Sequence, residues 1–366
     1  MTPVKKSLFR LDGRGPTFQW AAVVVVSAVL AAVIYAARLP AHHLLGGMGA
    51  GLAAALLGAT VRMPKQIIYF GLCVVCAMIA RTMSPSTLDD IAGNWPIFVL
   101  MVILVVVVSS LMGWLLAKTG MFPGSTAVWG TSPGAPTTMT ILSEKYGADA
   151  RLVAFLQYSR VMVVAVVSSL VAYCFGETRV AVAVAGDWFP PVYWAGFFQT
   201  IALCLFATIV CVKAGSPMWA IVIPMFCGTI LHHAGVMTIE LPWWFETLAY
   251  GAVGIGIGLR FTWQIVVHAL RSLPKVLASI FITLAVCSVF GLFFYSMIGI
   301  DPLSAYFAAS PVGMDCIAII ASTLDVNMSF IMAVHISRLF VVVTLGPSIA
   351  IFIAKRMGAQ EMKTGE

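Results

Sequence analysis

The chain has 366 residues, of which 61% are hydrophobic and only 10% are charged, and its formal net charge is +7. A soluble protein carries about 25% charged residues, so this composition excludes a soluble enzyme or a DNA-binding domain. No polar segment is long enough to gather the basic face that nucleic acid requires. Uncharged apolar runs such as 20–37 and 96–117 can cross a bilayer core of about 30 Å. The sequence therefore predicts an all-α polytopic membrane protein that lies in a lipid bilayer.

Hydropathy predicts ten spanning helices and two interrupted apolar stretches. In chain order the ten spans are 18–38, 43–60, 66–80, 96–117, 152–175, 191–212, 217–233, 242–259, 275–298 and 328–354. The stretches 121–146 and 300–324 contain proline and small polar residues, and each could cross the membrane or dip in and return.

The distribution of basic residues favours a return to the same side for both interrupted stretches. With re-entrant stretches, 16 of the 21 lysines and arginines lie inside and three lie outside. If both stretches crossed, 11 would lie inside and eight outside. Because positive charge concentrates on the cytoplasmic side, we expect re-entrant segments, with both termini in the cytoplasm and the chain in the bacterial inner membrane.

Matching residues recur at an offset near 178. Ser132-Pro133 returns as Ser310-Pro311, and Ser159-Arg160 returns as Ser337-Arg338. Each copy holds five predicted spans, an odd number, so the second copy is expected upside down relative to the first. Inverted repeats of this kind are typical of secondary transporters. The predicted boundaries are a cytoplasmic segment 1–17, a first membrane repeat 18–175, an external loop 176–190, a second membrane repeat 191–354 and a cytoplasmic tail 355–366.

The two interrupted stretches are the predicted substrate site. Non-helical backbone at membrane depth is tolerated only where it is buried in protein or lines a polar cavity. The half-helix that restarts after each break presents amides with partial positive charge, which favour an anion. The residues expected to line the site are Ser132, Pro133, Gly134, Thr137 and Thr138 in the first break and Ser310, Gly313 and Asp315 in the second. A proline and glycine kink absorbed by neighbouring helices is the structural alternative.

Arg160 and Arg338 are the most informative side chains, because each lies near the middle of a predicted span. A cation at the bilayer centre costs at least about 2.5–3.5 kcal/mol and is a functional hypothesis by default. Gln157 and His335 precede the arginines by three residues and so share their helix faces. Two interpretations stay open: the arginines bind substrate, or they hold backbone carbonyls of the broken helices or a nearby carboxylate. Both interpretations place the arginines against the broken segments.

Two further features concern coupling and assembly. Asp315 could pair with Arg338, bind a coupling cation or carry a proton, and pairing is favoured. His335 is able to titrate near neutral pH, and a structural histidine held by hydrogen bonds is the equal alternative. The sequence leaves H⁺ and Na⁺ open as coupling ions and predicts neither a resident cofactor nor a metal site. The glycine pairs at 47 and 51 and at 254 and 258 offer close-packing faces, either for a homodimer or within one subunit.

With these residues, the sequence resembles the membrane AbrB family, bacterial integral membrane proteins with a duplicated domain. The resemblance rests on Ser132-Pro133-Gly134, on Met139 through Asp149, on the helix 157–160, and on the second copy from Ser310 to Arg338. It extends loosely over about 20–355. The family usually places an acidic residue before a methionine after each Pro-Gly-Gly, whereas this chain has Thr138 and Cys316 there. Family labels include transcriptional regulator and ammonia monooxygenase; the first conflicts with the lack of a soluble domain, and the second with the lack of a metal-ligand cluster.

The main hypothesis is a secondary transporter of a small organic anion that works by alternating access. The moving unit is expected to contain both broken segments and the helices 152–175 and 328–354, while the other helices form a scaffold and a homodimer interface. The alternative is a non-transporting membrane sensor or regulatory partner that binds a small ligand. An enzyme is the third choice and is not expected.

Overall fold

The computed structural model describes most of the chain. The described residues are 11, 13–82, 95–118, 122, 125–133, 139–140, 143–144, 146–175, 192–215, 219–261, 273–311, 314–322 and 324–356. The predicted external loop 176–190 and the tail from residue 357 lie outside these ranges, so the predicted domain boundaries are not tested.

The described part of the chain is helical throughout and contains no strand, which confirms the all-α class. The helices are α1 (Pro16–Ala36), α2 (His42–Leu56), α3 (Lys65–Thr82), α5 (Trp95–Lys118), α6 (Thr126–Thr131), α8 (Ala150–Cys174), α9 (Trp194–Ala214), α10 (Trp219–His233), α11 (Trp243–Gly258), α13 (Leu273–Ile298), α14 (Pro302–Ala309), α15 (Met314–Ser322) and α16 (Met328–Arg356). Each of the ten predicted spans overlaps one of these helices.

Five of the described helices are long and apolar enough to cross a membrane. They are α1, α5 from Phe98 onward, α8, α9, and α13 as far as Met297. The outward side of α1 is apolar: Val25, Val29 and Val33 are 61%, 57% and 60% exposed. Soluble proteins rarely leave such a continuous apolar face in water, so these helices indicate a membrane protein. The count of ten spans stays a prediction.

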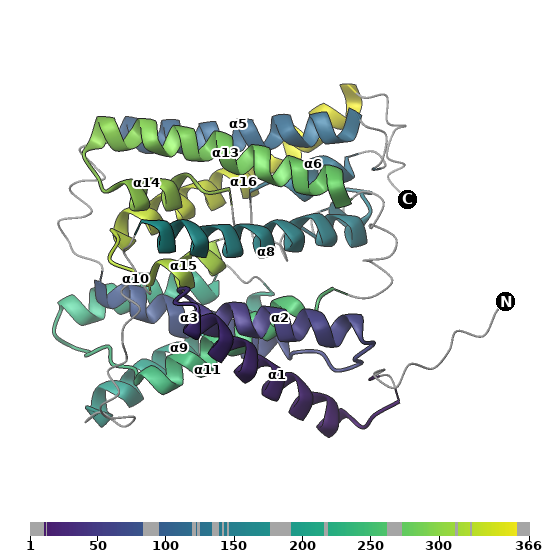
Figure 1. The fold of residues 1–366 in the computed structure, drawn as a ribbon. Coiled ribbons are helices and arrows are strands. Elements are labelled where there is room, and N and C mark those ends of the chain that lie inside the picture. Colours follow the sequence, from purple (N-terminus) through teal and green to yellow (C-terminus); the bar gives the residue numbers. More distant parts are fainter. Residues whose placement is uncertain are drawn as a thin grey trace.

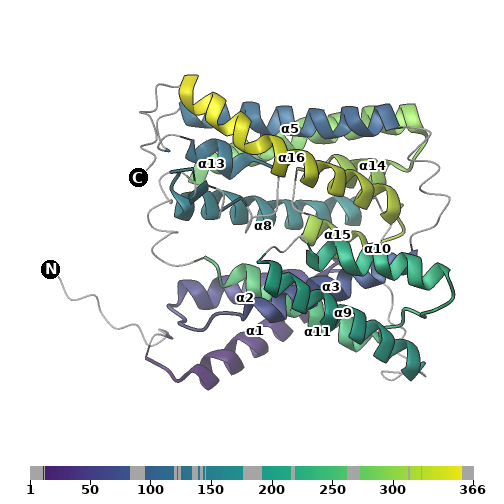
Figure 2. The ribbon, with the colours of Figure 1, turned by 180° about the vertical axis from the view of Figure 1, so that it is seen from behind.

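The helices form two layers, visible from both sides in Figure 1 and Figure 2. One layer contains α1, α2, α3, α9, α10 and α11, and we call it the glycine layer. The other contains α5, α6, α8, α13, α14 and α16, and we call it the arginine layer. The short helix α15 lies between them and packs against α3, α8 and α16.

The arginine layer is larger than the predicted moving unit. The predicted scaffold includes 96–117 and 275–298, but α5 packs on α6 and α13 packs on α14. A glycine permits each close approach. A Cβ added to Gly291 of α13 would lie 2.9 Å from the Ala305 carbonyl oxygen, and one added to Gly113 of α5 would collide with the Thr131 hydroxyl. These two apolar helices therefore belong with the broken segments.

Glycines also bring α2 and α11 together in the other layer. A Cβ on Gly51 would lie 2.6 Å from the Ile255 carbonyl oxygen, and one on Gly47 would lie 2.6 Å from the Gly251 carbonyl oxygen. A Cβ on Gly254 would collide with the Leu44 carbonyl. The predicted close-packing faces are thus used within one chain, which removes them as homodimer contacts.

Candidate functional site

The first helix break is held by Arg160 and Gln157 of α8. Helix α6 ends at Thr131, and Ser132 turns to an extended conformation with φ −55° and ψ 130°, so the last carbonyls of α6 lack intrahelical partners. Arg160 donates to the carbonyl oxygens of Thr131 (2.7 Å) and Ser132 (3.0 Å), and to Gln157 Oε1 (2.6 Å). Gln157 Nε2 donates to the carbonyl oxygens of Trp129 (2.8 Å) and Ser132 (3.0 Å). A cation at the C-terminal end of a half-helix also complements its dipole.

The second break repeats this arrangement 178 residues later. Helix α14 ends at Ala309, and Ser310 has φ −58° and ψ 131°. Arg338 Nη1 donates to the Ser310 carbonyl oxygen (2.6 Å), and Arg338 Nη2 lies 2.8 Å from His335 Nδ1. His335 Nε2 lies 3.0 Å from the Phe307 carbonyl oxygen. His335 therefore stands where Gln157 stands in the first copy.

The hydrogen-bond partners assign the protonation of His335. The Phe307 carbonyl can only accept, so Nε2 must carry the ring proton. The guanidinium N–H of Arg338 can only donate, so Nδ1 must be bare. The imidazole is consequently neutral in this arrangement, and its two nitrogens perform the roles of the amide nitrogen and oxygen of Gln157.

Each broken segment begins and ends at the same place. The backbone N–H of Asp149, at the start of α8, donates to Thr126 Oγ1 at the start of α6 (3.2 Å). The backbone N–H of Asn327, at the start of α16, donates to Ser304 Oγ in the first turn of α14 (2.7 Å). The two ends of each broken segment therefore lie together, and each arginine contacts the break between them, which we call the tip. We call 126–149 and 304–327 the first and second hairpins.

The tips of the hairpins form a buried positive site. Arg160 and Arg338 are 4% and 2% exposed, and their helices, α8 and α16, lie in the same layer (Figure 1). Within the described residues, the partners of Arg160 are neutral oxygens, and its Nε has no partner. The hydroxyl of Ser310, 1% exposed, also lacks a partner there. A buried cation whose described partners are all neutral is costly, so the unused donors at Arg160 Nε and Ser310 Oγ suit an anionic ligand.

Comparison with known proteins shows the family. The family described as Transition state regulatory protein AbrB matches residues 43–354, a range that includes both hairpins and both arginines. The chain belongs to the AbrB family. Its 366 residues are similar to the protein named Putative regulator AbrB of Escherichia coli (strain K12), with 39% identity over 340 residues, which cover 93% of this chain and 97% of that relative.

A more distant relative comes from Bacillus subtilis (strain 168). The protein named Uncharacterized protein YhjN is 22% identical over 301 residues, and the alignment covers 74% of each chain. No solved structure matches this chain. The family resemblance predicted from the two serine-proline breaks and their arginine helices is therefore confirmed.

The structure brings together most of the predicted site residues that it describes. Gln157 and Arg160 meet Ser132, and His335 and Arg338 meet Ser310. Pro133 is buried beside Ser132. The remaining predicted residues, namely Gly134, Thr137, Thr138, Gly313 and the side chain of Asp315, lie outside the part that the structure describes. The predicted pairing of Asp315 with Arg338 therefore stays a prediction.

Sequence reasoning missed the hairpin bases. Thr126 and Ser304 stand 178 residues apart, as do Asp149 and Asn327. The offset of the internal repeat therefore pairs the residues of the two bases. Both base hydroxyls accept from the residue that begins the arginine helix. A search for paired hydroxyl and capping residues at this offset would have found them.

Proposed function

We propose that this AbrB-family protein is a secondary transporter of a small organic anion, bound between the tips of the two hairpins. The observation that carries the proposal is a pair of buried arginines at two helix breaks, with unused donors at Arg160 Nε and Ser310 Oγ. A carboxylate placed there would accept from both donors and offset the buried positive charge.

The arginines also brace the hairpins. This supports a role in which substrate binding is coupled to the conformation of the hairpin tips. Three donated bonds tie Arg160 to α6 and to Gln157, so the guanidinium cannot turn toward a ligand without loosening the first tip. The unused Nε offers a contact that leaves those bonds in place. We therefore place the substrate on the Nε side of Arg160.

The two halves of the chain support an alternating-access cycle. Helices α2 and α3 have counterparts 177–178 residues later in α10 and α11, and α2 packs on α11 while α3 packs on α10. Such exchanged pairs are expected when two repeats are related by a twofold axis. We propose inverted repeats of five spans and one re-entrant hairpin each, with both termini in the cytoplasm of a bacterial inner membrane. The coupling ion is H⁺ or Na⁺.

The experiment is uptake of labelled monocarboxylates, dicarboxylates and tricarboxylates into proteoliposomes that contain the purified chain. We expect flux for one class, and loss of that flux with Arg160→Ala and with Arg338→Ala. Ser310→Ala tests ligand contact more directly, because the hydroxyl has no protein partner within the described residues to lose. One lost hydrogen bond of about 1–1.5 kcal/mol should raise KM roughly five- to tenfold while the melting temperature is unchanged.

Ser296→Ala is the matched control for this serine. Its hydroxyl is exposed and donates to the Phe293 carbonyl of its own helix (2.7 Å), so the same chemical change is made away from the site. Intact transport of every anion class in both arginine variants would remove these side chains from the substrate site.

A second candidate is a ligand-binding membrane regulator. The name Putative regulator AbrB of the Escherichia coli relative favours it. In that case the positive site would bind an anion and report its presence to another protein without moving it. A stable soluble partner in a pull-down, together with no flux for any anion class, would support the regulator over the transporter.

A further inference from the structure

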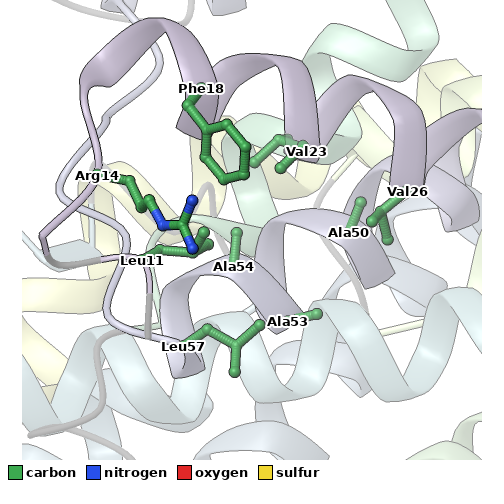
Figure 3. A pocket seen from close by; sticks show the side chains of 10 residues that line it. Leu11, Arg14, Phe18, Val23, Val26, Ala50, Ala53, Ala54 and Leu57 are labelled. Atoms are coloured by element: carbon green, nitrogen blue, oxygen red, sulfur yellow. The ribbon is translucent and has the colours of Figure 1, made fainter. Parts of the chain in front are cut away.

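A cavity lies between α1 and α2, and its lining residues are separate from the hairpins (Figure 3). It has a volume of about 340 Å³. Its walls are formed by Phe18, Val23 and Val26 from α1 and by alanines and Leu57 from α2. Phe18 and Val26 are 49% and 40% exposed, so the cavity opens on the outer surface of the glycine layer.

The chain builds this cavity with a buried polar side chain. Gln19, 1% exposed, donates to the carbonyl oxygens of Leu11 and Arg14, each at 2.9 Å, and accepts from the backbone N–H of Thr60 at 2.9 Å. The backbone N–H of Leu11 donates to the Leu57 carbonyl oxygen at 2.9 Å. These bonds strap the segment before α1 onto the end of α2, so Leu11 and Arg14 are held at the rim.

Arg14 is the one polar side chain among the residues that line this cavity. Its guanidinium lies 4.8 Å from the centre of the Phe18 ring, and within the described residues it has no acidic partner and no hydrogen-bond acceptor. Three more basic residues, Lys5, Lys6 and Arg10, precede it in the sequence. A cation fixed beside an apolar cavity suits a ligand that has both parts. Its apolar chain would occupy the cavity and its negatively charged group would meet the cation.

We propose that this cavity binds an anionic phospholipid, with one acyl chain between α1 and α2 and the phosphate on Arg14. Two observations favour a lipid over a second copy of the chain. The exposed valines of α1 continue the cavity wall into an apolar face, as expected for contact with lipid tails. The charge lies at one end of the cavity, as in a lipid, and basic residues near an anionic leaflet attract its headgroups.

The test is native mass spectrometry of the full chain in detergent, with phosphatidylglycerol and phosphatidylcholine of identical acyl chains as probes. Wild type should retain phosphatidylglycerol preferentially. Arg14→Gln should lower that preference about fivefold, the worth of one basic residue near an anionic surface. Ala53→Phe, which fills the cavity from α2, should lower retention of both lipids.

Lys213→Gln is the matched control, since it removes one exposed cation at the end of α9, the counterpart of α1 178 residues later. This variant should retain both lipids as wild type does. Unchanged preference in Arg14→Gln, or unchanged retention of both lipids in Ala53→Phe, would overturn the proposal. So would a dimer that Ala53→Phe converts to monomer, because a second copy would then occupy the cavity.

Discussion

The neutral ring of His335 predicts a pH dependence of stability that a single substitution removes. His335→Gln places in the second copy the residue that performs the same bracing in the first, where Gln157 donates to a carbonyl and accepts from an arginine. The brace on α14 should persist, because an amide supplies the same donor and acceptor as the neutral imidazole. The variant should therefore fold and differ from wild type mainly in proton binding at this site.

The magnitude follows from the bonds that the ring makes. A proton added at Nδ1 of His335 would face the N–H of Arg338, which lies 2.8 Å away. The folded state therefore excludes a proton that an unfolded imidazole takes up below about pH 6.5. When the unfolded state binds one more proton, the free energy of unfolding falls by about 1.4 kcal/mol for each pH unit below that value.

The sign is a loss of stability on acidification. The contribution of neutral His335 is present above about pH 6.5 and declines as the pH falls, by about 2 kcal/mol at pH 5. The assay is unfolding of wild type, His335→Gln and Gln157→His in SDS titrations between pH 5 and 8. Proton binding elsewhere affects all three chains alike, so His335→Gln should lose this slope and Gln157→His should gain a second one. Parallel pH profiles for wild type and His335→Gln would refute the assignment of a neutral ring.

Three further predictions test the hairpin base, the glycine contact and the orientation. Thr126→Val removes the hydroxyl that closes the first hairpin and should cost about 1 kcal/mol of unfolding free energy; an unchanged value would show that the base bond does not hold the hairpin. Gly254→Ala should destabilise the α2–α11 contact by about 1–3 kcal/mol, whereas Gly251→Ala, with open space at its Cβ position, should be neutral or stabilising, and equal effects would contradict the packing. Reporter fusions in the loop 176–190 should read outside and those in 261–273 inside, and cytoplasmic labelling of 176–190 would undo the inverted repeat.

The sequence predicted the helices and the breaks because both depend on local chemistry. Long apolar runs without charge form membrane helices in most contexts, and a serine-proline pair ends a helix by removing a donor. The contact of each arginine with a break was also predictable, since a cation at depth needs acceptors and a broken helix has orphan carbonyls. The structure shows that the arginines hold carbonyl oxygens of the breaks, and their contact with a substrate stays a prediction.

Layer membership could not be predicted in the same way. Helix α5 is apolar on all sides, so its sequence does not say which face packs on a neighbour or on which neighbour. Its only strong local signal is Gly113, and Gly291 matches it 178 residues later. The glycines of α2 and α11 posed a similar problem, because close packing within a chain and between chains requires the same small residues. In both cases the helix that packs against the segment is determined by tertiary structure, not by the local sequence.

The bracing bonds limit which parts of the molecule can move separately. Arg160 and Gln157 tie α8 to the tip of the first hairpin, and the Asp149–Thr126 bond ties α8 to its base. Sliding α8 along α6 would break bonds at both ends and leave buried polar groups without partners, at about 1–3 kcal/mol each. The second hairpin and α16 are tied in the same way. We therefore expect each hairpin to move together with its arginine helix. In the proposed alternating-access cycle the motion would then lie between the arginine layer and the glycine layer, where α3 meets α15 and α16 and α2 meets α8.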